Sequence, residues 1–220
     1  MFLHTHPYEP FLFEDTTKLI VGTLPPPRFS TGDLKEGDVN FCYGSKDGQL
    51  WPILDQIFGL NLKYESTREA VKQRKDFLKE RKIGICDIVQ SANRLKVDAS
   101  DLGMKNVNLR DLIGYLNKYS KVDTLLFTGG NSKNGPEYFF RRLMKQNGLS
   151  LEPVSEEVPK VHKFKMVGDL NRTIRTVSLT APSGSANRAV GSFISYKRRK
   201  AENPGYTTVQ FRVDQYRDFF

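Results

Sequence analysis

The chain has 220 residues, of which 38% are hydrophobic and 27% are charged, a composition typical of globular proteins and not of disordered or fibrous ones. Basic residues outnumber acidic ones by 34 to 25, and the net charge of +9 favours a polyanionic partner, although a basic protein without such a partner would show the same excess. The apolar runs are too short to cross a bilayer, and the N-terminal segment lacks the pattern of a signal peptide. Two distant cysteines and three histidines predict neither a disulfide framework nor a metal site. We therefore expect a reduced, cytoplasmic protein without membrane contact.

Strand and helix patterns alternate in the first part of the chain. Residues 18–24 predict a buried strand that ends at three prolines, which cannot continue strand pairing. Residues 28–48 predict a long loop rich in glycine and aspartate, and loops of this length are often functional. Apolar residues at helical spacing predict a helix over 50–58 and a second over 66–82, where Ser66 begins a capping box.

The middle of the chain predicts two more strands, over 83–89 and 124–127. Asn108 suits the N-cap of a helix over 108–119. A further helix over 136–146 begins with a proline, which is favourable in the first turn. This alternation of strands and helices is typical of an α/β protein with a largely parallel sheet.

The pattern changes beyond the fourth helix. Apolar and polar residues alternate there and predict an extra β-hairpin near 161–180, with arms at 161–167 and 173–180 and a polar turn at 168–172. The second arm is expected to join the main sheet. The segment from Tyr206 to the end has no clear type.

Ligands of open α/β sheets bind beyond the carboxyl ends of the strands. Three segments fit that place, namely 22–25, 86–89 and 181–187. The last one has small residues before a predicted helix, so its free backbone N–H groups could hold a phosphate. An ordinary strand-to-helix turn would have the same composition.

Four segments, taken in order, carry a resemblance to a known family. They are VGTLP from residue 21, YGSKDGQLWP from residue 43, GICDIV from residue 84 and PSGSAN from residue 182. With them the chain resembles the uracil-DNA glycosylase superfamily, and its mismatch-specific and hypoxanthine-DNA glycosylase-like branches most closely, over most of residues 18–196. The resemblance implies a single domain over 1–220, a three-layer α/β/α sandwich around a mainly parallel four-stranded sheet. It also implies a monomer that needs no cofactor and no metal.

The resemblance implies an enzyme of base-excision repair that acts on damaged duplex or single-stranded DNA. Such an enzyme flips a deaminated base, uracil or hypoxanthine, into a pocket and hydrolyses its N-glycosidic bond. A carboxylate or amide positions the water, and N–H donors stabilise the negative charge that develops on the base. An aromatic ring stacks on the flipped base.

Two positions that carry catalytic side chains in the family carry none here. Leu24 stands where many members have Asn or Asp, and Gly48 stands where the hypoxanthine branch has Asn. We expect the neighbouring Asp47 to be the first catalytic candidate, although an aspartate also suits a turn there. Asp87 resembles the aspartate on the second strand of the family and is the second candidate, with a structural carboxylate as the alternative.

The resemblance also assigns a base pocket. Its expected lining from the first motif is Gly22, Thr23, Leu24 and Pro25. Phe41 and Tyr43 are candidates for the ring that stacks on the base, and a place in the core is equally compatible with either.

The last motif resembles the loop that enters the minor groove and contacts phosphates. Its DNA-binding candidates are Ser183, Gly184, Ser185, Asn187 and Arg188. Ala181 stands where the strongest uracil enzymes have His, so one donor to the base is missing here. The basic run 197–200 suits either a phosphate contact or a helix end whose dipole it stabilises.

Two other functions remain open from the sequence. A nucleic-acid-binding protein of the same fold that has lost catalysis would also explain Leu24, Gly48 and Ala181. A hydrolase or binder of a free nucleoside is compatible with the fold class, because fold does not determine function. Salt-dependent DNA binding without base release would favour the first alternative, and stabilisation by a nucleoside but not by DNA would favour the second.

Overall fold

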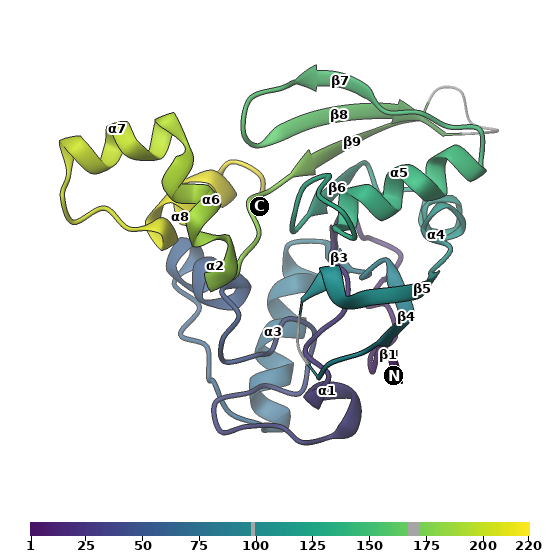
Figure 1. The fold of residues 1–220 in the computed structure, drawn as a ribbon, viewed down its shortest axis with the longest axis horizontal. Coiled ribbons are helices and arrows are strands. Elements are labelled where there is room, and N and C mark those ends of the chain that lie inside the picture. The colour runs from purple at the N-terminus through teal and green to yellow at the C-terminus, as the bar shows by residue number, and fades with distance from the viewer. Residues whose placement is uncertain (98–99, 167–171) are drawn as a thin grey trace.

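The computed structural model describes residues 1–97, 100–166 and 172–220. At its centre is a six-stranded sheet in the order β3-β2-β6-β9-β8-β7 (Figure 1). The strands are β2 (Lys18–Val21), β3 (Ile83–Ile85), β6 (Thr124–Phe127), β7 (Glu152–Ser155), β8 (Lys160–Lys165) and β9 (Thr173–Ser178). The first four in the sheet order are parallel, and β8 and β7 extend the sheet in antiparallel fashion. This confirms the predicted mainly parallel sheet with an added hairpin.

Both faces of the sheet are buried, as near-continuous apolar strands predict. Along β2, Leu19 and Val21 belong to one apolar core and Ile20 to the other, and all three are fully buried. The first core is closed by α4 (Leu112–Lys118) and α5 (Pro136–Gln146). The second is closed by α2 (Leu50–Phe58), α3 (Arg68–Glu80) and α8 (Thr208–Arg217). The predicted three-layer α/β/α sandwich is therefore confirmed.

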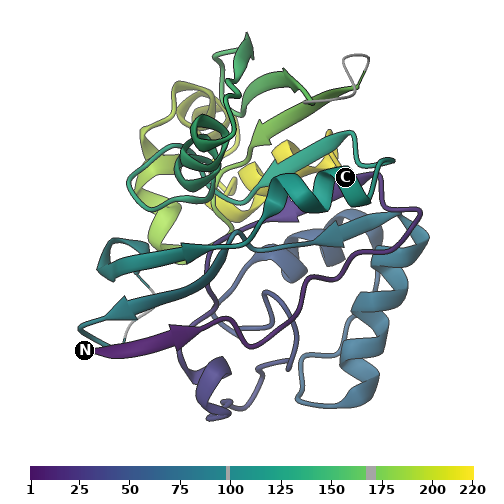
Figure 2. The ribbon, with the colours of Figure 1, turned by 90° about the vertical axis from the view of Figure 1, so that its right-hand side faces the viewer.

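A second sheet, which the sequence pattern does not predict, lies beside the first. It is antiparallel, in the order β1-β4-β5, and consists of β1 (Phe2–Thr5), β4 (Val89–Arg94) and β5 (Met104–Leu109). Figure 2 shows its three strands projecting from the body of the sandwich. The predicted strand over 83–89 divides between the two sheets, because β3 ends at Ile85 and Val89 begins β4.

Two helices begin later than the sequence predicts. The helix expected to start at Asn108 starts after Asp111, whose carboxylate accepts a hydrogen bond from the N–H of Gly114 at 2.8 Å. Asn108 lies in β5 instead. Likewise, α3 is capped by Thr67 rather than by Ser66. In both helices the acceptor that reaches the third N–H decides where the helix begins.

The C-terminal part contains the predicted hairpin and a further helix. β8 and β9 pair along their length, and β9 joins the main sheet beside β6. Of the predicted turn at 168–172, all but Arg172 lies outside the described residues. The end of the chain, which has no clear type in the sequence, forms α8, where Thr207 and Gln210 make a capping box. α8 packs against α2.

The remaining helices are short. They are α1 (Arg28–Thr31), α6 (Asn187–Ser192) and α7 (Ile194–Glu202), with 3-10 turns at Asp101–Gly103 and Gly184–Ala186. None of the helices in the described ranges is long and apolar enough to cross a membrane.

Candidate active site

A buried aspartate joins three segments of the chain at the carboxyl edge of the main sheet. Asp87 follows β3 and is 6% exposed. Its carboxylate accepts hydrogen bonds from the backbone N–H of Gly22 (2.8 Å), the hydroxyl of Tyr43 (2.8 Å) and Nε2 of His6 (2.9 Å). Because a buried carboxylate is costly without partners, these donors are needed for Asp87 to stay in this position. We call Asp87, His6, Gly22, Tyr43 and Thr128 the Asp87 network.

Tyr43 and Gly22 pack closely within the Asp87 network. A Cβ at Gly22 would lie 2.2 Å from the Tyr43 hydroxyl oxygen and 2.7 Å from Oδ1 of Asp87. Tyr43 has a φ of 58°, which is uncommon for a residue other than glycine, and its hydroxyl also lies 3.1 Å from Oγ1 of Thr128. Burial and the charge of Asp87 raise the pKa of Tyr43 well above its usual value. The hydroxyl therefore remains a proton donor at neutral pH.

A cavity of about 540 Å³ adjoins the Asp87 network. It lies beyond the carboxyl ends of β6 and β9 and is bounded by the first turn of α5, by β8 and by α6. Thr128 belongs to both the cavity wall and the network. The other polar side chains of the wall include Asp101, Glu137, Arg141, His162, Ser178 and Thr180. Its size is that of a small-molecule site.

A carboxylate, a guanidinium and a neutral imidazole lie together in the lining of the cavity. Glu137 is 1% exposed and accepts hydrogen bonds from Oγ of Ser178 (2.5 Å) and Nε of Arg141 (2.7 Å). Nη2 of Arg141 lies 3.0 Å from Nε2 of His162. Burial and the Arg141 charge lower the pKa of His162, so the ring is neutral at pH 7 and its Nδ1 carries the proton. Nδ1 is itself buried, and no group among the described residues accepts a hydrogen bond from it.

Asp101, in the connection between β4 and β5, also lines the cavity. Its Oδ1 accepts a hydrogen bond from Oγ1 of Thr23 at 2.7 Å, and its backbone carbonyl accepts one from Nδ2 of Asn134 at 2.9 Å. Burial raises the pKa of Asp101 to about 6. Within the described ranges, no group of three or more His, Cys, Asp or Glu side chains is arranged to hold a metal ion.

Of the two catalytic candidates, Asp87 lies at the centre of this network, whereas Asp47 lies on the surface. The Asp47 side chain is 70% exposed, and the nearest charged group to its carboxylate is Nη2 of Arg28 at 3.4 Å. The loop that carries it pairs with the last motif through a bridge between Gly48 and Ser183. The structure thus brings the second and fourth motifs together, but it does not place Asp47 in the wall of the cavity.

The base-pocket candidates divide between the network and the core. Gly22 and Tyr43 belong to the Asp87 network, and Thr23 bonds Asp101. Leu24 is 8% exposed and packs in the core shared with α4 and α5. Phe41 is 6% exposed among other rings, with its centroid 6.2 Å from that of Trp51, as the core-aromatic alternative describes. Pro25 is partly exposed.

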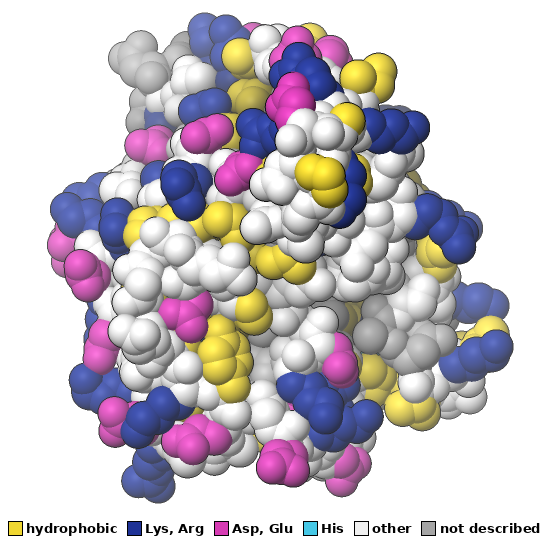
Figure 3. Space-filling model, turned by 90° about the vertical axis from the view of Figure 1, so that its left-hand side faces the viewer, with side chains coloured by type: hydrophobic (Ala, Val, Ile, Leu, Met, Phe, Trp, Pro, Cys, Tyr) yellow, Lys and Arg dark blue, Asp and Glu magenta, His cyan; other side chains and the backbone are white. Residues whose placement is uncertain are grey.

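The DNA-binding candidates lie on the surface beside the cavity. Gly184, Ser185, Asn187 and Arg188 are exposed or partly exposed, as is Ser183. Figure 3 views the molecule from the side on which α6 and α7 lie, and on this face Lys and Arg side chains are interspersed with Asp and Glu side chains. The loop is therefore accessible to a large partner.

Arg212 on α8 holds this loop in place. The side chain is fully buried and donates to the carbonyl oxygens of Ala181 (2.8 Å) and Ser183 (3.0 Å) and to Oδ1 of Asn187 (3.0 Å). Sequence reasoning missed Arg212 because nothing in the pattern of the last segment distinguishes an internal arginine from a solvated one. It missed His6 for the same reason.

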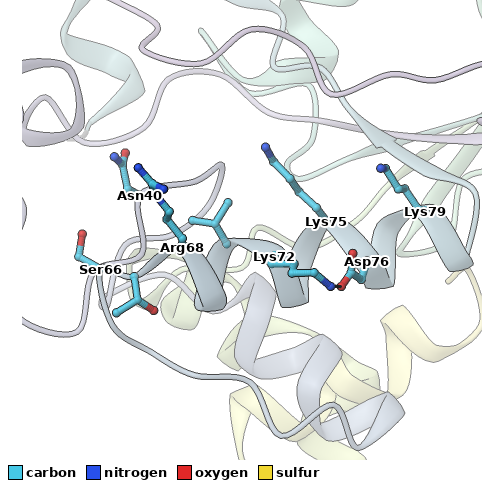
Figure 4. A pocket seen from close by; sticks show the side chains of 9 residues that line it. Asn40, Ser66, Arg68, Lys72, Lys75, Asp76 and Lys79 are labelled. Carbon is cyan, nitrogen blue, oxygen red and sulfur yellow. Dashed lines mark hydrogen bonds and ion pairs between the residues drawn. The ribbon is translucent and has the colours of Figure 1, made fainter.

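A second cavity, also of about 540 Å³, runs along α3. Its charged lining consists of Arg68, Lys72, Lys75, Asp76 and Lys79. In Figure 4, Lys72 and Asp76 pair with each other, while Arg68, Lys75 and Lys79 extend along one side of the helix together with Asn40. We call this feature the α3 groove.

Comparisons with known proteins bear on the fold. No family model and no curated protein matches the chain. Among solved structures it is similar to the solution NMR structure of a "putative Uracil DNA glycosylase" from Methanosarcina acetivorans, with 16% sequence identity and a TM-score of 0.54. The match covers 97% of this chain and 99% of the other. At this identity the similarity is one of fold along nearly the whole length of both chains.

Proposed function

We propose that this chain, whose fold matches that of the archaeal protein end to end, is a DNA glycosylase that excises a deaminated base, uracil or hypoxanthine, by hydrolysing its N-glycosidic bond. One observation carries the proposal. The first three motifs meet at one buried carboxylate, Asp87, and the fourth borders the cavity next to it. Ligands of α/β sheets bind at this edge.

The cavity suits a flipped base. A nucleobase must leave the stack and enter a protein pocket before its glycosidic bond can be attacked, and the 540 Å³ cavity is large enough to hold one. The guanidinium of Arg141, whose side chain lines the cavity and is 35% exposed, supplies donors for the oxygen atoms of the base. Donors that are already in place when negative charge develops lower the barrier, because they need not reorganise.

The two catalytic candidates take different places in this proposal. Asp87 orders Tyr43 and Gly22 beneath the cavity. Asp47 lies on the exposed loop that pairs with Ser183, and we expect it to meet the sugar of a bound strand from outside. The departures at Leu24, Gly48 and Ala181 mean that the site contains no side chain of the usual kind at those positions.

The partner is DNA, as damaged duplex or single strand, bound by a monomer. Ser183, Gly184, Ser185, Asn187 and Arg188 provide hydroxyl, backbone and guanidinium groups suited to phosphates. The α3 groove adds a second basic surface for the phosphodiester backbone. The net charge of +9 supports both contacts, since neutralised phosphates release counterions.

The test is a base-release assay. End-labelled duplexes and single strands that carry uracil, hypoxanthine or xanthine are incubated with the protein at low salt and then cleaved with hot alkali at abasic sites. We expect cleavage at one deaminated base, and we expect Asp47→Ala and Asp87→Ala to lower it while DNA binding stays nearly unchanged. Asp123→Ala, at an exposed position just before β6, is the matched control. Full activity of both alanine variants would contradict the assignment of the two aspartates.

A nucleic-acid-binding protein without catalysis is the second candidate. Leu24 favours this second candidate. Its side chain is apolar and buried, so the first motif offers a ligand no polar group at this position. Salt-dependent DNA binding with no release of any of the three bases would establish it and refute the glycosylase.

A further inference from the structure

Three acidic side chains outside the Asp87 network line the cavity, and their carboxylate oxygens have different hydrogen-bond and ion-pair partners. Glu137 accepts from Ser178 through one oxygen and from Arg141 through the other. Glu156 is 63% exposed and pairs with Lys160. Asp101 accepts one hydrogen bond, from Thr23, through Oδ1, and Oδ2 accepts none from the residues that the structure describes.

Asp101 is held firmly in spite of its place in a short turn. The 3-10 turn Asp101–Gly103 precedes β5. Nδ2 of Asn134 donates to the carbonyls of both Asp101 (2.9 Å) and Met104 (3.2 Å), so the turn is tied to the loop before α5. The second sheet thereby brings a carboxylate over the carboxyl edge of the main sheet, next to Thr23 of the first motif.

The electrostatics of Asp101 suit proton transfer near neutral pH. Burial raises its pKa to about 6, Asp87 adds to the rise, and the Thr23 hydroxyl and the Arg94 charge oppose it. Above pH 6 the side chain is ionised and can accept a proton, and below pH 6 it cannot. The remaining charged and titratable groups around the cavity are Glu137, Arg141, Glu156, Lys160 and His162. A general base acts best when its pKa lies near the working pH.

We propose that Asp101 is the carboxylate that positions and activates the attacking water, an inference that rests on the proposed glycosylase function. The free Oδ2 accepts a hydrogen bond from a water molecule in the cavity. As the water oxygen forms its bond to C1′ of the deoxyribose, the C1′–N bond breaks and its electron pair leaves with the base. The water proton moves to Asp101 and from there to the departing base, so the products are a hydroxyl at C1′ and the neutral base.

This assignment gives two residues that line the cavity separate roles. Arg141 offers its guanidinium as a donor to the leaving base, and Asp101 is the general base that activates the nucleophile. Hydrolysis by acid–base catalysis uses two groups with different proton affinities, and the surroundings of each group set its proton affinity. Asp87 then acts through Tyr43 and Gly22 as a positioning residue.

The test compares the wild type with Asp101→Asn in single-turnover base release as a function of pH. Asparagine keeps the size of the side chain and the acceptor for Thr23 but cannot take up a proton. We expect the rate at pH 7.5 to fall by about 10²-fold or more, DNA affinity to change by less than about threefold, and the loss of activity below pH 6 to disappear. Asp123→Asn, which removes the same charge from an exposed position just before β6, should keep the wild-type profile.

A second variant tests the same carboxylate without removing it. Thr23→Val deletes the hydrogen bond that favours the ionised form of Asp101, so the acid limb of the rate profile should move to higher pH. Unchanged rates and profiles for both Asp101→Asn and Thr23→Val would overturn the role of Asp101 while leaving the glycosylase proposal intact. A wild type that binds DNA but releases no base would overturn both.

Discussion

Close packing at single residues decides how the site is built. Gly22 follows β2, where its N–H reaches Asp87 and where Tyr43 and Thr128 meet above it. The space beside the Gly22 Cα is filled, so a methyl group there would have to displace the Tyr43 hydroxyl, which is already hydrogen-bonded. Interiors packed at this density respond to the addition of a single carbon.

Gly22→Ala should therefore destabilise the protein by about 1–3 kcal/mol. Its Cβ would lie 2.2 Å from the Tyr43 hydroxyl oxygen, and Tyr43→Phe in the same chain should recover part of the loss because it removes that oxygen. Gly191→Ala is the matched control, since a Cβ in α6 meets nothing within 4 Å. The measurement is the free energy of unfolding in urea. Equal stabilities of the two single variants would show that the site can relax around the added methyl.

At the scale of elements, the long loop between β2 and α2 is ordered by one buried carboxylate. The Asp38 side chain is fully buried and accepts hydrogen bonds from Nε and Nη2 of Arg28 and from the backbone N–H groups of Lys35 and Lys46. Although burial alone would raise it, these donors lower the pKa of Asp38 to about 2. The loop that carries Tyr43 and Asp47 is thus held as a fixed element.

The pH dependence of stability should reveal this carboxylate. The folded-state pKa of Asp38 lies below the unfolded value of 3.8, so its contribution is complete above pH 4 and is lost as the pH falls toward 2. Asp38→Asn should be less stable than the wild type at pH 7, and the difference should shrink between pH 4 and pH 2. Asp33→Asn, in the same loop but exposed, should change stability little at either pH. A difference that stays constant with pH would contradict the linkage.

At the scale of the whole molecule, the basic and acidic side chains are divided between the outer surface and the cavity. The basic excess of the sequence does not gather in the cavity, where Asp101, Glu137 and Glu156 balance Arg141 and Lys160. Positive side chains lie instead on the outer surface, where Figure 3 shows them among acidic ones, and along the α3 groove. This arrangement suits a long anionic partner that rests on the surface while one unit of it enters the interior.

The α3 groove should contribute to DNA affinity through charge alone. Replacing Arg68 and Lys79 together by glutamine should weaken binding and reduce the slope of log affinity against log salt by about 1 for each phosphate that is no longer neutralised. The matched control is the same double replacement at Lys118 and Lys121, near the end of α4. Fluorescence anisotropy with a labelled duplex at several salt concentrations provides the slopes. Equal slopes for the two double variants would exclude a role for the groove.

The main layers of the fold follow from local sequence pattern. Apolar runs such as those of β2 and β6 have one stable place, buried between two layers of helices, and the helices α2 and α5 follow from periodicity and from a proline in the first turn. The first, third and fourth motifs lie at the same edge of the sheet, because the strands β2, β3 and β9 that lead to them run in the same direction. The local sequence pattern is enough to predict these features, because each is stabilised by residues nearby in the chain or by the burial of apolar side chains.

Which polar groups share the site depends on the folded chain and not on local pattern. His6, Thr128, Asp101, His162 and Arg212 come from five separate segments, and in the sequence each looks like an ordinary solvated or core residue. The second sheet was equally hidden, because β1 pairs with β4 only across a long separation in the chain. Hydrogen bonds between distant segments depend on three-dimensional placement, which no local periodicity encodes. For the same reason the sequence singled out Asp47, whereas the fold turned it toward solvent and placed Asp101 at the cavity.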